Sequence, residues 1–116
     1  MKTTYTALII PARMSEPVRV DTIEAGLRTL QGLVGGDIQA ITRGDWQVYL
    51  NADAVVANLP PNLRAAQLMN DCGLDIAGIT RGTAVFLGQG DHGAEADVPR
   101  HLIRLADHLF DVRLVA

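Results

Sequence analysis

Residues 38–50 read IQAITRGDWQVYL, and this stretch is typical of a β-hairpin. Two runs rich in β-branched and aromatic side chains flank Arg43-Gly44-Asp45, where glycine can adopt the positive φ of a tight turn. The second run continues to Asn51, and apolar side chains alternate with more polar ones along it. Since successive side chains of a strand point to opposite faces of a sheet, we expect Trp46 and Leu50 on one face and Asn51 on the other.

The segment before the hairpin predicts two strands and a helix. Thr4–Ile10 (TYTALII) is apolar and β-branched, which favours a central strand, and Val18–Val20 alternates as a short second strand. A helix should then begin at Asp21 or Thr22, both good N-caps, and stop at Gly35-Gly36. One face of that helix would carry, at helical spacing, Ile23, Leu27, Leu30 and Val34.

The segment after the hairpin predicts two further helices and more strands. Ala52–Leu59 is ambiguous between loop and strand, and Leu63–Met69 has helix-forming composition. A flexible, glycine-rich loop is expected over Gly88–Ala96, and a helix should begin near the N-cap Asp97. The strands expected in this half are Ile76–Ile79, Thr83–Leu87 and the alternating part of Phe110–Val115.

This order of elements predicts the α+β class, with a mixed or mainly antiparallel sheet and about three helices. The chain has 116 residues, so we expect one domain over residues 1–116 with one core. Hydrophobic residues make up 48% of the chain and aromatic ones only 4%, so that core must consist mainly of aliphatic side chains.

The net charge and the cysteine content limit the kinds of partner and the cellular compartment that we expect. The net charge of −3 gives no general attraction to nucleic acid or to anionic lipid. Cys72 is the one cysteine, so no intrachain disulfide can form. No secretory leader is recognisable, and the apolar runs are far too short to cross a membrane. We therefore expect a soluble, cytoplasmic protein.

The residues predict no catalytic group, no cofactor and no metal site. His101 and His108 are seven positions apart, which is too far for two ligands of one ion on a helix without other help. Gly88–Gly93 matches the GxGxxG spacing of dinucleotide-binding loops, but no helix opens at its end and acidic residues follow. We interpret this segment as a mobile loop in which Gly88 and Gly90 are candidate binding positions.

Residues 51–68, NADAVVANLPPNLRAAQL, supply the other candidate binding residues. Asn62 is well placed as the N-cap of the following helix, and Asn51 lies at a strand end. Asn58 and Arg64 have no evident local role. A purely architectural reading of the segment competes with one in which these four side chains contact a ligand or a partner.

The same segment carries a family resemblance. The order LQGLVGGDIQAI (Leu30–Ile41), Asn51, LPPNLRAAQL (Leu59–Leu68) and GTAVFLG (Gly82–Gly88) resembles an uncharacterised domain-of-unknown-function family of small proteins. Its members are typically encoded by phages and plasmids of actinobacteria and other Gram-positive bacteria. Members often carry an acidic turn after the second hairpin strand, where this chain has Asn51-Ala52-Asp53-Ala54. The resemblance implies a setting and transfers no catalytic residue.

Three functional hypotheses follow, each with a different partner. The first is a non-enzymatic accessory protein of a phage or mobile element that binds a host protein in the bacterial cytoplasm, in host takeover or counter-defence. The second is a protein that binds or sequesters a nucleotide-like small molecule. The third and weakest is DNA binding through Arg100, Arg104 and Arg113. Pairing of strand edges into a homodimer is the default expectation for a small open sheet.

Overall fold

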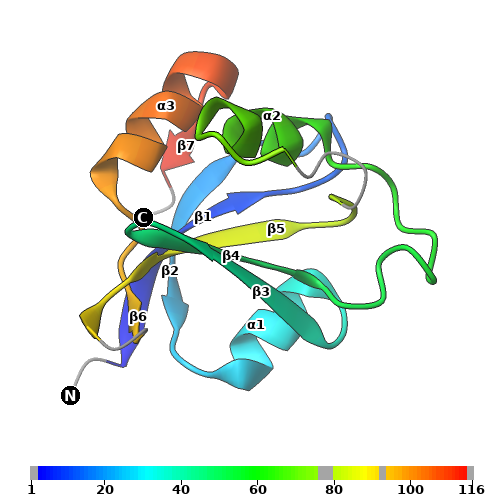
Figure 1. Cartoon of the computed structure of the whole chain (residues 1–116), viewed down its shortest axis with the longest axis horizontal. Coiled ribbons are helices and arrows are strands. Elements are labelled where there is room, and N and C mark those ends of the chain that lie inside the picture. Colours follow the sequence, from blue (N-terminus) through cyan, green and yellow to red (C-terminus); the bar gives the residue numbers. More distant parts are fainter. Residues whose placement is uncertain (1–2, 76–79, 92–93, 115–116) are drawn as a thin grey trace.

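In the described part of the chain, a computed structural model shows seven strands and three helices (Figure 1). The structure describes residues 3–75, 80–91 and 94–114. The strands are β1 (Thr4–Ile10), β2 (Arg19–Glu24), β3 (Ile38–Arg43), β4 (Trp46–Asn51), β5 (Ala84–Gln89), β6 (Glu95–Ala96) and β7 (Arg113–Leu114). The helices are α1 (Leu27–Val34), α2 (Leu63–Asp71) and α3 (Arg100–Phe110).

The strands form one mixed, mainly antiparallel sheet in the order β3-β4-β5-β1-β2-β7, and β6 pairs with the end of β5. Only the short β2–β7 pair is parallel among the strands that the structure describes. The predicted α+β class, the hairpin at 38–50 and the central position of Thr4–Ile10 are all confirmed.

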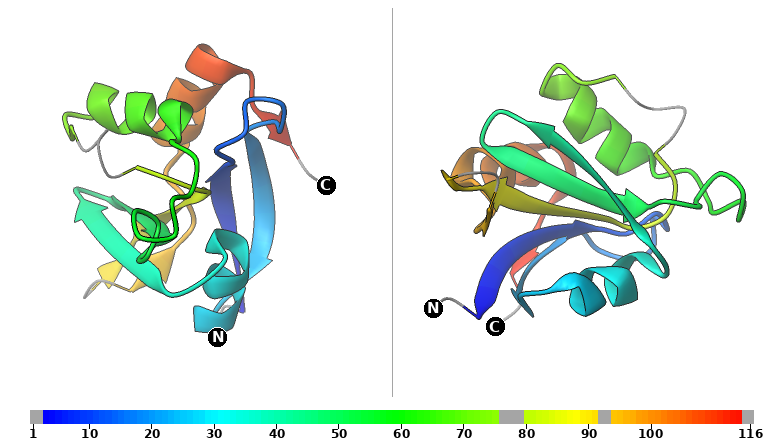
Figure 2. Two further views of the ribbon diagram at one scale, coloured as in Figure 1. Left: turned by 90° about the vertical axis from the view of Figure 1, so that its right-hand side faces the viewer. Right: turned by 60° about the horizontal axis from the view of Figure 1, so that its bottom comes forward.

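Helices cover both faces of the sheet (Figure 2). On one face α2 and α3 pack on alternate residues of the central strands, among them Leu8, Val48 and Phe86. On the other face α1 packs on the intervening residues, among them Ile9 and Tyr49. Every residue of β4 is therefore buried, although its alternating sequence suggested one apolar and one polar face. The predicted separation of residues 46–51 onto two faces is confirmed.

The expected helix start at Asp21 or Thr22 is wrong. Ile23 belongs to β2, where it pairs with Tyr5, and α1 begins only at Leu27 behind Gly26. Ile23 suits either element, because its spacing from Leu27 fits a helix while its β-branched side chain suits a strand. Six residue pairs with β1 decide in favour of the strand. The end of the helix is as predicted, with Gly35 in the left-handed conformation.

Two predictions in the C-terminal third also need correction. The segment Gly88–Ala96, expected to be a flexible loop, contains the last two residues of β5 and the whole of β6. In it Gly88 pairs with Ala96 and Gln89 pairs with Glu95. Asp97 does not cap α3, whose N-cap is Pro99; instead Asp97 Oδ1 accepts a hydrogen bond from the backbone N–H of Thr6. The strand predicted at 76–79 lies outside the described residues.

Candidate functional site

Three connecting segments meet at one end of the sheet, which we call the loop end: residues 11–18, 52–62 and 80–83. They meet there because β1 and β4 both run antiparallel to β5, so the carboxyl ends of the first two lie beside the start of the third. Residues 52–62 project from this end, at the right of Figure 1. Four of the six binding residues predicted from the sequence lie at or beside the loop end.

Asn62 joins two segments of the loop end, 52–62 and 80–83, to the end of β1. Its Oδ1 accepts a hydrogen bond from the backbone N–H of Ala65, which confirms the predicted N-cap of α2. Its Nδ2 donates to the carbonyl oxygens of Ile10 and Gly82, each at 2.8 Å. With its side chain buried and these bonds made, Asn62 holds the helix start against the ends of β1 and β5.

Arg64, in the first turn of α2, holds the β1–β2 loop. Its Nη2 donates to the carbonyl oxygens of Pro11, Arg13 and Glu16 at 2.8 to 2.9 Å. The residue is only 8% exposed, and its Nε is buried without a hydrogen-bond acceptor among the described residues. Burial lowers the pKa of Arg64, and the carboxylate of Glu16 opposes that shift. Nothing in the local sequence indicates this role, because the three acceptors are backbone atoms about fifty positions earlier.

Asn58 closes a compact turn at the tip of the loop end. Its φ of 52° is left-handed, a conformation that asparagine tolerates better than most residues. Backbone hydrogen bonds from Asn58 to Val55 and from Leu59 to Ala54 complete the turn. The ambiguous segment Ala52–Leu59 is therefore a hydrogen-bonded turn, and Asn58 has a local role in it that the sequence analysis did not assign.

Asn51 lies on the α1 side of the sheet. Its Nδ2 donates to the carbonyl oxygen of Val34, and its Oδ1 accepts from the backbone N–H of Asp53. A Cβ on Gly36 would lie 3.0 Å from Nδ2 of Asn51, so the glycine permits this close approach. Asn51 therefore fastens the end of α1 to the end of β4.

Gly88 and Gly90 lie at the opposite end of β5, far along the sheet from the loop end. A Cβ on Gly88 would lie 2.2 Å from the carbonyl oxygen of Asp97, which requires glycine there. The backbone N–H of Gly90 donates to the carbonyl oxygen of Ala94 across the β5–β6 connection. The six predicted residues thus do not line one common site, and their role in binding stays a prediction.

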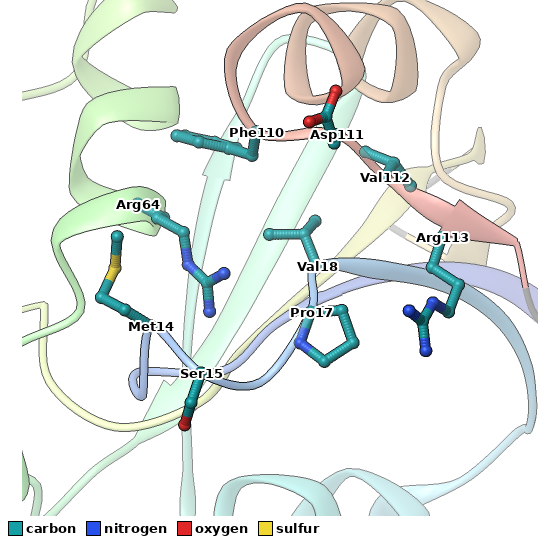
Figure 3. Close-up of a pocket in the computed structure, with 9 residues that line it drawn as sticks. All are labelled: Met14, Ser15, Pro17, Val18, Arg64, Phe110, Asp111, Val112 and Arg113. Carbon is teal, nitrogen blue, oxygen red and sulfur yellow. The ribbon is translucent and has the colours of Figure 1, made fainter.

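Two cavities flank the β1–β2 loop. The larger, of about 610 Å³, lies between this loop, the start of α2 and the α3–β7 connection. Arg64 and Arg113 both border it (Figure 3). The smaller, of about 300 Å³, lies on the α1 side of the loop and is bordered by Pro11, Val34, Pro60 and Gly82.

The loop end and the adjoining first residue of α2 also expose large apolar side chains. Met14 and Leu63 are 66% and 68% exposed, and Val55 and Val56 on the compact turn are 59% and 89% exposed. Leu27, at the start of α1, is the other large apolar residue exposed to this degree in the described part of the chain. The sequence analysis did not single out these side chains; their nearness to turn signals in the PPN and ADAVVAN segments was the available clue.

The remaining candidates from the sequence lie apart from the loop end. His101 Nε2 lies 2.9 Å from Oδ1 of Asp45, which joins α3 to the β3–β4 turn. Burial and the neighbouring Asp71 raise the pKa of the Cys72 thiol. Within residues 3–75, 80–91 and 94–114, no three potential metal ligands come together, and no helix is long and apolar enough to span a membrane.

Comparison with known proteins gives one family and one similar fold. A family described as a domain of unknown function (DUF3846) matches residues 5–111. No curated protein matches. Part of the crystal structure of small RNA methyltransferase HEN1 has a similar fold, with a TM-score of 0.56 and 18% identity. The match covers 89% of this chain and 16% of that chain, and at this identity it shows the fold alone.

Proposed function

The chain belongs to the DUF3846 family, and we propose from its own surface that it acts by binding another protein through the loop end. The observation that carries the proposal is the exposure of Val55 and Val56 on a turn closed by its own hydrogen bonds. Each of these valines would bury apolar surface on binding, which favours association by removing that surface from water.

The order of the turn adds to this argument. Binding through a flexible loop costs conformational entropy, whereas the Val55–Val56 turn already has left-handed Asn58 and the Leu59–Ala54 hydrogen bond in place. Met14 and Leu63 are further exposed apolar side chains on neighbouring segments. Such a surface suits a partner that presents an apolar patch of its own.

We further propose that the partner is a protein of the bacterial host, and that this chain is a cytoplasmic accessory protein of a phage or plasmid. The support is the resemblance of the VGG, LPPN and GTAVFLG segments to small proteins of such elements. Binding would then alter the physiology of the host or weaken one of its defences.

The test is an affinity capture from host lysate with three baits. The intact chain is compared with the double variant Val55→Ser, Val56→Ser and with the control Leu27→Ser, which replaces an exposed leucine outside the loop end. We expect a partner that the intact chain and the control both retain, and that the double variant retains roughly tenfold less. Equal capture by all three baits would show that the loop end is not the binding surface.

Two other functions remain as alternatives. For nucleotide-like binding, the favouring observation is the cavity that Arg64 borders, and a rise in melting temperature with a nucleotide would support it. DNA binding through Arg100, Arg104 and Arg113 would show a steep fall of affinity with salt, and binding that is unchanged by salt would exclude it.

A further inference from the structure

The larger cavity contains a buried cation whose hydrogen-bonding capacity is only partly used. A guanidinium group carries five N–H donors. In Arg64 the hydrogen bonds among the described residues all come from Nη2, and Nε is buried without an acceptor. Figure 3 shows this guanidinium group extending between Met14 and Val18 toward the space above Ser15 and Pro17.

No carboxylate pairs with Arg64 to neutralise it within the described chain. Its partners are three carbonyl oxygens, which carry only partial charges, and the Glu16 carboxylate acts on it without a hydrogen bond. A buried cation usually has an ionic partner, because burial removes the solvation that stabilises its charge. An anion in the cavity would supply that missing charge.

A second cation borders the same cavity. Arg113, on β7, projects on the other side of Pro17 and Val18 from Arg64 (Figure 3). Asp111 is the carboxylate among the residues that line the cavity, and its side chain points away from both guanidinium groups in that view. The rest of the wall is largely apolar and includes Val18, Phe110 and Val112.

We propose that this cavity binds a small organic oxyanion, a phosphate ester or a carboxylate, through Arg64 and Arg113. The apolar part of the ligand would lie against Phe110 and Val112. The volume of 610 Å³ is within the usual range for small-molecule sites and is larger than an inorganic anion needs. This site shares Arg64 with the six binding residues predicted from the sequence and Arg113 with the DNA-binding hypothesis, and it does not depend on the proposed binding of a protein at the loop end.

The test is a titration of the whole chain followed by NMR of the arginine Nε–H groups. Phenyl phosphate and benzoate represent the two kinds of oxyanion, inorganic phosphate lacks the apolar part, and benzamide lacks the charge. We expect the Arg64 Nε–H resonance to shift with phenyl phosphate or benzoate at a dissociation constant on the order of 1 mM or below. Inorganic phosphate should bind several-fold more weakly, and benzamide should leave the resonance unchanged.

Two variants separate this site from general attraction of anions. Arg113→Gln removes the exposed cation of the cavity, and Arg100→Gln removes an exposed cation of α3 that does not line it. We expect the first to weaken binding roughly tenfold and the second to change it less than about twofold. Because neither residue is buried, both variants should fold, which the backbone spectrum verifies.

Three results would overturn the proposal. These are an unchanged Arg64 resonance with both oxyanions, equal weakening by the two variants, and binding of benzamide as strong as that of benzoate. Whichever of phenyl phosphate and benzoate binds more tightly identifies the kind of anionic group that the site prefers. The outcome is independent of whether Val55 and Val56 bind a protein partner.

Discussion

Nδ2 of Asn62 donates a 2.8 Å hydrogen bond to the carbonyl oxygen of Ile10, and so joins the start of α2 to the end of the central strand β1. Replacement by alanine would remove this bond, the bond to Gly82 and the helix cap. We expect Asn62→Ala to lower the free energy of unfolding by about 3 kcal/mol, measured by urea denaturation. A loss below about 1 kcal/mol would show that water replaces the bonds.

The variant Asn62→Asp distinguishes the contribution of the helix cap to stability from that of the two hydrogen bonds that Nδ2 donates. Aspartate keeps the acceptor for Ala65 N–H but turns a carboxylate toward the carbonyl oxygens of Ile10 and Gly82. Burial among acceptors favours the protonated carboxyl group. As the pH falls from about 7 to about 5, the free energy of unfolding of this variant should therefore rise relative to that of the natural chain. If the free energies of unfolding of the two chains changed with pH in parallel, the hydrogen bonds assigned to Asn62 would be contradicted.

Gly88 and Gly90 should respond differently to the same substitution. A Cβ at Gly88 would meet the backbone oxygen of Asp97 at 2.2 Å, whereas at Gly90 the nearest atom, the oxygen of Ala94, is 3.4 Å away. We expect Gly88→Ala to cost about 3 kcal/mol or more, and Gly90→Ala less than about 1 kcal/mol. Thermal melts of the two variants provide the measurement, and equal losses would mean that the β5–β6 connection can move aside.

The environment of Tyr49 leads us to expect that the folded chain loses stability at alkaline pH. Burial, with the nearby Glu95, raises the pKa of Tyr49 to about 12. The unfolded chain releases the phenol proton near pH 10 while the folded chain retains it, so the free energy of unfolding should fall as the pH rises from about 10 to about 12. The decrease should be on the order of 2 kcal/mol. Tyr49→Phe should lack this part of the decline, and an unchanged difference between the two chains across that range would refute the assignment.

Cys72 should react slowly with alkylating reagents. Since burial and Asp71 raise the pKa of its thiol, the folded chain holds less of the reactive thiolate at about pH 8 than the unfolded chain does. We expect iodoacetamide to modify folded Cys72 several-fold more slowly than the same residue in urea. Asp71→Asn should speed the reaction and Arg43→Gln should slow it, because the Arg43 charge lowers this pKa. Identical alkylation rates for the two variants would show that burial slows the reaction only by keeping the reagent away from the Cys72 thiol.

Local signals in the sequence predicted much of the fold. The alternation and glycine turn of residues 38–50, the left-handed Gly35 and the cap at Asn62 each depend on neighbours within a few positions. The start of α1 was mispredicted because Ile23 fits two periodicities, and pairing with a strand eighteen positions earlier decides between them.

The site was less predictable for the same reason. Arg64 donates hydrogen bonds to the carbonyl oxygens of Pro11, Arg13 and Glu16. Every residue has a backbone oxygen, so the sequence does not indicate which of these atoms a side chain will contact. That Arg64 and Arg113 border the same cavity depends on the parallel β2–β7 pair, which places β7 beside β2. By contrast, the left-handed turn at Asn58 did have a local signal, since asparagine is enriched in that conformation.

The pairing of β1 with β5 has a consequence for the order of events during synthesis. Leu8 and Ile9 leave the ribosome well before their partners Phe86 and Val85, which follow more than seventy positions later in the chain. Until then β1 can pair with β2 alone, and its other edge is open. Because such distant pairing is slow and open apolar edges promote aggregation, we expect the nascent chain to be most prone to aggregation during this interval.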